Sequence, residues 1–213
     1  MSETLAVVVL LVVGYLVGSF PSGVVYGKLG RGVDVRWVGS GNPGATNTLR
    51  ALGWKFALAV GLTDILKGVL PVVLARLTVG LPLAEVAAAF GAIAGHNWSL
   101  ALGFRGGRGV ATSIGTFLVI APLPALVAVL AFVLVVWRTR YVSLGSILAA
   151  VVALLAFLAG VLLGWRPPGE YYVYTIAGAL LLIIRHADNI QRLRAGVEPR
   201  LGEPLGRPRV PAP

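Results

Sequence analysis

Long apolar segments, each with hardly a charged residue, alternate with short polar stretches along the chain. The clearest of them cover residues 5–25, 56–79, 83–94, 143–164 and 171–184. A helix needs about 20 apolar residues to cross the hydrocarbon core of a bilayer, and most of these segments approach that length. The pattern predicts an all-α integral membrane protein.

A further apolar segment, residues 111–137, permits two interpretations because Pro122 and Pro124 interrupt it. As one span, it would place the arginine-rich C-terminal part opposite the first basic loop. If it forms two short spans divided at the prolines, all of the 18 basic residues except Lys67, Arg76 and Arg166 lie on one side of the membrane. The positive-inside bias favours the second arrangement. We therefore predict seven transmembrane helices, some short or re-entrant, with the N-terminus outside and the C-terminus in the cytoplasm.

Composition supports one membrane domain over residues 1–196, followed by a Pro/Arg-rich cytoplasmic tail over residues 197–213 that we expect to be extended or poorly ordered. The chain is 57% hydrophobic and 12% charged, and its mean hydropathy is +0.88. Its 28 glycines are typical of close helix contacts in membranes. The net charge of +10 lies in the connections between spans, so it indicates topology and no nucleic-acid partner. The absence of cysteine excludes disulfides and thiol catalysis.

The first polar stretch, residues 40–50, reads SGNPGATNTLR. Gly41, Pro43 and Gly44 favour a loop, and the chain can become helical from Ala45. Amides at a helix N-terminus, with Arg50 one to two turns further on, would suit an anion such as phosphate. The alternative interpretation is a polar connection between two apolar helices.

Two further polar stretches contain both histidines of the chain. Residues 95–112 hold His96 and a glycine-rich basic loop, RGGRG, and residues 185–193 hold His186. Within the second apolar segment, Asp64 and Lys67 stand at i and i+3 on one helical face, where they form an ion pair with each other or serve a site. The ion pair is the interpretation we favour.

The inventory of reactive groups is short. Two histidines without a matching carboxylate cluster do not make the three- or four-ligand set of a zinc site, so we expect no metal and no cofactor. The chain has no G-x-S-x-G elbow and no Walker loop. Arginines, hydroxyls, amides and glycine-flanked backbone remain, and such groups bind phosphates and stabilise charge on them. They generate no nucleophile, which points to a substrate that arrives already activated.

Three motifs resemble those of one bacterial family. SGNPGATNxxR, GHNWSLALGFRGGRGVAT and RHxxNIxRLxxGxE occur in the order found in the acyl-phosphate:glycerol-3-phosphate acyltransferases, the PlsY family. The resemblance covers nearly the whole chain. It implies transfer of a fatty acyl group from acyl phosphate to glycerol 3-phosphate, giving lysophosphatidic acid and phosphate for phospholipid synthesis. It also implies seven helices in the bacterial cytoplasmic (inner) membrane, with the active site on the cytoplasmic side. Arg108 stands where the family usually has lysine, and Ser99 where a proline is common.

The resemblance also implies roles for particular residues. The residues expected to carry the reaction by binding and orienting substrate are Ser40, Arg50, Arg108, His186 and Asn189. The residues expected to bind substrate around them are Asn42, Gly44, Thr46, Asn47, Lys67, His96, Gly106, Gly107, Gly109, Ser143 and Arg192. The expected partners are acyl phosphate, glycerol 3-phosphate, membrane lipid and the enzyme that supplies acyl phosphate.

The acceptor of the hydroxyl proton stays open between His96, His186 and a phosphate oxygen of the substrate. We favour the phosphate, because no carboxylate of the motifs is evidently placed to orient either histidine. A small-anion transporter is the competing class, but it would place polar groups near the midplane with access from both sides.

Overall fold

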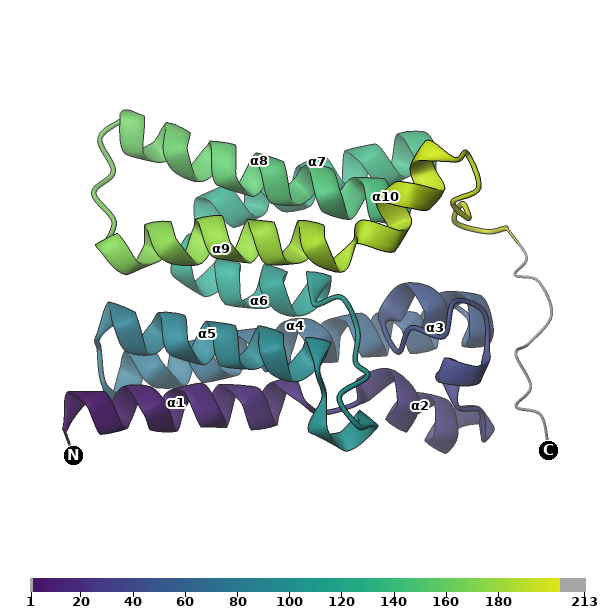
Figure 1. The fold of residues 1–213 in the computed structure, drawn as a ribbon, viewed down its shortest axis with the longest axis horizontal. Helices are drawn as coiled ribbons and strands as arrows, with labels where there is room; N and C mark the ends of the chain where they lie inside the picture. The colour runs from purple at the N-terminus through teal and green to yellow at the C-terminus, as the bar shows by residue number, and fades with distance from the viewer. Residues whose placement is uncertain (1, 204–213) are drawn as a thin grey trace.

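The computed structural model describes residues 2–203, which form ten α-helices joined by short connections (Figure 1). Their bounds are α1 (Glu3–Gly18), α2 (Ser22–Arg31), α3 (Ala45–Leu52), α4 (Trp54–Thr78), α5 (Pro82–Asn97), α6 (Val110–Ile120), α7 (Pro122–Thr139), α8 (Val142–Leu162), α9 (Gly169–Arg185) and α10 (Ala187–Arg194). Short 3₁₀ turns follow α2 and α5, at Val35–Trp37 and Leu100–Leu102. The helical fold class is confirmed.

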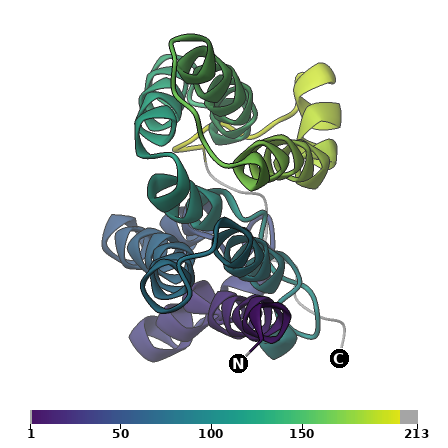
Figure 2. The ribbon, with the colours of Figure 1, turned by 90° about the vertical axis from the view of Figure 1, so that its left-hand side faces the viewer.

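The long helices lie roughly side by side and run back and forth along one axis (Figure 1). Viewed end-on, α1, α2, α4 and α5 occupy one half of the molecule and α7 to α10 the other, with α6 between them (Figure 2). Helix α6 packs on α4 and on α7, so it joins the two halves. The short helices α3 and α10 lie at the end opposite to the start of α1 (Figure 1).

Several helices are long and apolar enough to cross a membrane. Four continuous candidates are residues 3–31, α4, α7 and α8, and the bent pair α9 and α10 makes a fifth if it is counted as one span. Helix α5 has 16 residues and α6 only 11. The multi-pass membrane character follows from these helices, while the number of crossings and the sidedness of the termini stay predictions.

Prolines set two boundaries. The first apolar segment was expected to continue from residue 5 to 25, but α1 ends at Gly18 and α2 starts at Ser22. Pro21 explains the break, because it has no N–H and its ring opposes helical backbone before it. Residues 111–137 form α6 and α7, separated at Ala121. The division at Pro122 is the one that the two-segment interpretation requires.

Glycines bring α1 and α5 into backbone contact. Gly14 and Gly18 on α1 face Ala88 and Ala92, and a Cβ at either glycine would overlap the carbonyl oxygen opposite. Gly91 and Gly95 on α5 face the backbone of α1 in the same way. Each pair is spaced as G-x-x-x-G, the arrangement with which membrane helices approach closely. The glycine content therefore serves helix packing here, as the composition predicts.

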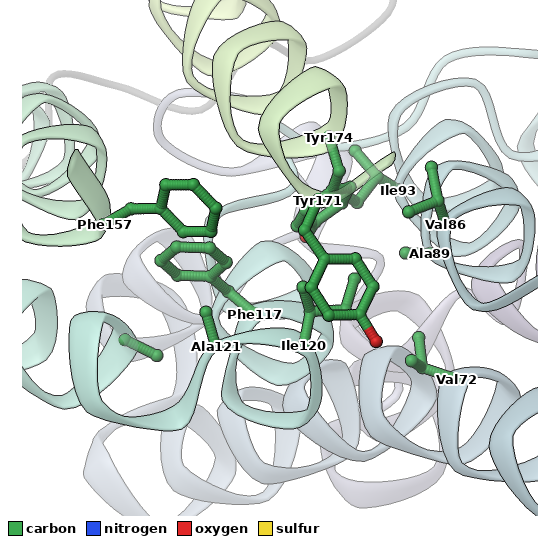
Figure 3. Close-up of a cluster of buried hydrophobic side chains, with 11 residues drawn as sticks. Val72, Val86, Ala89, Ile93, Phe117, Ile120, Ala121, Phe157, Tyr171 and Tyr174 are labelled. Atoms are coloured by element: carbon green, nitrogen blue, oxygen red, sulfur yellow. The ribbon is translucent and has the colours of Figure 1, made fainter. Parts of the chain in front are cut away.

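The largest apolar core lies where helices α4 to α9 meet (Figure 3). Phe117, Phe157, Tyr171 and Tyr174 contribute its rings, and smaller side chains such as Ala89 fill the space between them. Many leucines outside this core are half exposed or more, for example Leu70 and Leu130 at 58% and 70%. Such an apolar exterior suits hydrocarbon as the surrounding medium.

Candidate active site

The three polar stretches meet at the end of the bundle that carries α3 and α10 (Figure 1). The Arg185 guanidinium, at the end of α9, donates to the Gly107 carbonyl at 2.8 Å. The Ser143 hydroxyl, at the start of α8, lies 2.6 Å from a carboxylate oxygen of Glu198. Arg50 donates to the Pro199 carbonyl at 3.2 Å. The sequence prediction that these stretches converge at one end is confirmed.

Glu198 holds the polar end together, and the sequence analysis did not select it. Its carboxylate accepts from the Ser143 hydroxyl and the Asn189 amide, both at 2.6 Å, and from Arg192 Nε at 2.8 Å. The side chain is 9% exposed although it follows residue 196, where the tail was expected to begin. The signal was present, because Glu198 is the last residue of the third motif.

The C-terminal segment lies across this end of the molecule. Arg50 on α3 contacts the carbonyls of Pro199 and Arg200, and Arg140 after α7 donates to the Leu201 carbonyl at 3.0 Å. Residues 197–203 are thus bound to α3, α7, α8 and α10 rather than extended away from them. The rest of the expected tail, residues 204–213, lies outside the described residues.

The glycine-rich loop turns part of its backbone inward. Gly106 N–H donates to the Asn97 carbonyl at 3.2 Å, and Gly107 N–H donates to the His96 carbonyl at 3.0 Å. These carbonyls end α5 and would otherwise lack helical partners. The N–H groups of Gly106 and Gly107 are therefore bonded within the fold, and the substrate-binding role of these glycines stays a prediction. Gly109, with φ of 78°, precedes α6 and directs the chain into that helix N-terminus.

Two arginines, one from each of the first two motifs, lie among the charged groups of the polar end. Arg108 lies close to Arg192, Glu198, Asp188 and Arg185, and burial, reinforced by Arg192, lowers the pKa of its guanidinium. Burial likewise lowers the pKa of Arg50, which Glu198 partly offsets. Both guanidinium groups stay charged at any physiological pH. They are placed to attract an anion at this end of the bundle.

The first motif is partly structural. The Asn47 amide donates to the carbonyls of Val35 and Val38 and accepts from Ser40 N–H, and its side chain is buried, so it is not available for substrate. The Gly44 N–H donates to the Asn42 side chain at 3.0 Å. Asn47 thus shapes the loop, while the substrate-binding roles of Asn42 and Gly44 stay predictions. Ser40 is exposed.

Lys67 and His96 lie below the polar end, inside the helices. The Lys67 ammonium pairs with Asp64 at 2.9 Å and donates to the Phe20 carbonyl at 3.0 Å. The predicted ion pair is confirmed, and the substrate-binding role of Lys67 stays a prediction. His96 is 8% exposed beneath Gly107, with its Nδ1 3.7 Å from Asp64 Oδ1. The carboxylate nearest to this histidine thus comes from outside the motifs, which the expectation about carboxylates of the motifs did not cover.

The third motif turns at the junction of α9 and α10, which meet at 56°. His186 stands at this bend, and its Nδ1 lies 2.8 Å from the Leu182 carbonyl. Because a carbonyl can only accept, Nδ1 carries a proton and Nε2 is the acceptor of the neutral ring. The Asn189 amide nitrogen is taken by Glu198, while its buried oxygen has no partner among the described residues.

Known proteins of similar sequence share one activity. The family model described as glycerol-3-phosphate acyltransferase matches residues 8–196. Glycerol-3-phosphate acyltransferase 2 of Moorella thermoacetica is 48% identical over 193 residues, which cover 91% of this chain and 96% of that protein. Glycerol-3-phosphate acyltransferase 1 of Deinococcus radiodurans is 46% identical over 202 residues, covering 94% and 98%.

Solved structures share the fold as well. The crystal structure of PlsY, an integral membrane glycerol 3-phosphate acyltransferase, in its glycerol 3-phosphate form matches with a TM-score of 0.84 and 39% identity over 92% of this chain and 96% of that one. Its lysophosphatidic acid form matches with a TM-score of 0.82 and 37% identity over 92% and 95%. The chain therefore belongs to the glycerol-3-phosphate acyltransferase family and is an integral membrane enzyme of the PlsY type.

Proposed function

We propose that the enzyme takes its acyl group from acyl phosphate and transfers it to glycerol 3-phosphate, at the cytoplasmic face of the bacterial inner membrane. The choice of acyl phosphate as the donor rests on the chemistry of the polar end. It gathers cationic side chains, Arg50, Arg108 and Arg192, for two phosphate groups. Among the described residues, no serine hydroxyl is hydrogen-bonded to a histidine, the pair that activates a nucleophile.

The reaction then depends on placing two anions. The glycerol hydroxyl oxygen attacks the acyl carbonyl carbon, the bond from that carbon to the phosphate oxygen breaks, and the hydroxyl proton passes to a phosphate oxygen of the substrate. Orientation of this kind supplies about 7–11 kcal/mol of a barrier. An acyl phosphate needs no further activation because it is a mixed anhydride. Arginine side chains stabilise the charge that moves onto the departing phosphate.

An apolar pocket between the helices suits the fatty acyl chain of the substrate. It lies between α6, α7, α8 and α9, with a lining that is almost entirely apolar. Three of its lining residues, Val110, Ser146 and Leu182, stand within one helical turn of Gly109, Ser143 and His186. The pocket thus begins beside the polar end and continues between the helices. We assign it to the acyl chain of the donor.

The test is a comparison of donors with purified enzyme and glycerol 3-phosphate. Lysophosphatidic acid should form from acyl phosphate in the presence of a chelator, and much more slowly from acyl-CoA or from acyl carrier protein. Equal turnover with acyl-CoA, or loss of activity in the chelator, contradicts the proposed donor and mechanism. The supplier of acyl phosphate is the partner that this donor implies.

A further inference from the structure

A cluster of buried charged groups lies inside the helices, next to His96, which contacts the glycine-rich loop. Asp64 is 1% exposed and Lys67 5% exposed. Asp64 Oδ1 accepts the Ser22 hydroxyl at 2.6 Å and the Lys67 ammonium at 2.9 Å. The Lys67 ammonium also donates to the Phe20 carbonyl in the break before Pro21. The cluster therefore fixes α4 to the α1–α2 break.

His96 connects this cluster to the loop above it. On one side its Nδ1 lies 3.7 Å from Asp64 Oδ1, beyond hydrogen-bond distance, and has no hydrogen-bond partner among the described residues. On the other side its Nε2 lies against Gly107, so closely that a Cβ at Gly107 would overlap it. The imidazole thus fills the layer between a fixed carboxylate and the backbone of the loop.

The loop is also attached to the end of α5 by its backbone. Gly107 N–H donates to the His96 carbonyl and Gly106 N–H to the Asn97 carbonyl. A Cβ at Gly109 would lie 2.6 Å from the Asn97 amide oxygen. From the other side, the Arg185 guanidinium donates to the Gly107 carbonyl at 2.8 Å. Its Cζ lies 5.3 Å from the centre of the Trp98 ring, over which it stacks. The position of the loop is thus fixed by His96 and Asn97 on one side and by Arg185 on the other.

We propose that Asp64 and His96 are positioning residues of the phosphate site: the carboxylate of Asp64, held by Ser22 and Lys67, faces the imidazole without a hydrogen bond and orients it electrostatically, and the imidazole sets the position of Gly107 and hence of Arg108. The inference rests on the proposed function only in taking the loop as part of the glycerol 3-phosphate site. It gives a role to Asp64 and Lys67, which lie outside the three motifs.

The end of the bundle away from the site offers a matched control. Glu85 is 4% exposed at the start of α5 and accepts from Arg76 at 2.6 Å and from the Tyr171 hydroxyl at 2.8 Å. It is therefore a buried carboxylate paired with one cation and one hydroxyl, as Asp64 is. Asp64→Asn and Glu85→Gln remove the same charge from similar surroundings, but only the first lies beneath the loop.

The affinity for glycerol 3-phosphate, measured by calorimetry without any acyl donor, is the first readout. Asp64→Asn should weaken it roughly tenfold, because small displacements of a positioned group are costly, while Glu85→Gln should leave it unchanged. In the acyltransferase assay, Asp64→Asn should raise KM for glycerol 3-phosphate and leave KM for the acyl donor unchanged. Equal affinity in the two variants overturns the proposal. Because the titration needs no donor, its outcome is separate from the donor test above.

A double-mutant cycle between His96 and Gly107 tests the contact itself, and it decides the matter if Asp64→Asn does not fold. Gly107→Ala should weaken glycerol 3-phosphate binding roughly ten- to a hundredfold, because the new methyl group meets the imidazole. In the His96→Ala background the imidazole is gone, so the same change should cost less than about threefold. Losses that simply multiply mean that His96 does not set the position of Gly107, and they overturn the proposal.

Discussion

Replacing Glu198 tests how the C-terminal segment closes the polar end. Glu198→Gln keeps the shape of the side chain and one oxygen acceptor, but an amide nitrogen takes the place of the other oxygen. Either Arg192 or the Ser143 and Asn189 pair then loses its acceptor. A hydrogen bond to a charged group contributes about 1.5–3 kcal/mol. Arg192 is 38% exposed, so solvent screens its share. We expect the variant to lose about 1.5–3 kcal/mol of unfolding free energy.

The pH dependence of the same variant gives a second, independent readout. Burial raises the pKa of Glu198, but the hydrogen bonds from Ser143, Asn189 and Arg192 lower it more, so it lies below its ordinary value of 4.5. A carboxyl with a lowered folded pKa stabilises the protein fully above the unfolded pKa and loses this contribution as the pH falls through the folded pKa. The stability difference between the unaltered enzyme and Glu198→Gln should therefore shrink below about pH 4.5.

The assay is unfolding of the detergent-purified enzyme, with Glu203→Gln as the control. Glu203 belongs to the same segment, but it is exposed, and among the described residues its side chain accepts only from Arg200 N–H, at 2.8 Å. Its replacement should change the stability by less than about 0.5 kcal/mol. Equal stability of the two variants at neutral pH refutes the reasoning, because it would mean that the bonds of Glu198 contribute nothing.

Three further predictions concern substrate, topology and packing. Arg108→Ala and Arg50→Ala should each lower kcat/KM about ten- to more than a hundredfold in a glycerol 3-phosphate titration, while Arg108→Lys should lose far less, since lysine also binds phosphate as a point charge. Near-normal kcat/KM for Arg108→Ala contradicts the assignment of Arg108 to phosphate binding. A single cysteine at Arg138 should react with an impermeant reagent only from the cytoplasm and one at Arg166 only from outside; labelling of both from the same side rules out the seven-span arrangement. Gly91→Ala should cost about 1–3 kcal/mol by overpacking α1, whereas Gly169→Ala, with open space around its Cβ, should cost almost nothing; equal unfolding midpoints contradict the close α1–α5 contact.

Much of the fold could be predicted because apolar length and proline are strong local signals. The predicted segment 56–79 closely matches α4, and Pro122 separates α6 from α7. The sequence did not locate the break at Pro21, because apolar residues resume soon after it, at Val24 and Val25. It also did not show that residues 187–194 form a helix, since their polar composition is equally typical of a loop.

The site could be predicted by region but not by the direction of each group. Three polar motifs in one chain indicate an anion site, and the structure brings them together. Whether an amide points to substrate or into the fold depends on tertiary contacts. The sequence therefore could not show that the backbone amide of Gly107 and the side-chain amide of Asn47 are bonded within the fold. Glu198 was missed because a proline-rich context after Gly196 predicts an extended tail, whereas three hydrogen bonds hold it in place.

The central claim is that the enzyme orients two phosphorylated substrates and supplies no nucleophile of its own. It is tested most directly by rapid mixing of enzyme with labelled acyl phosphate in the absence of glycerol 3-phosphate. The account predicts no stoichiometric burst of phosphate and no label on the protein, with lysophosphatidic acid and phosphate released together once glycerol 3-phosphate is added. A burst of one phosphate per enzyme, with the acyl group bound covalently to a side chain such as Ser40, would contradict it.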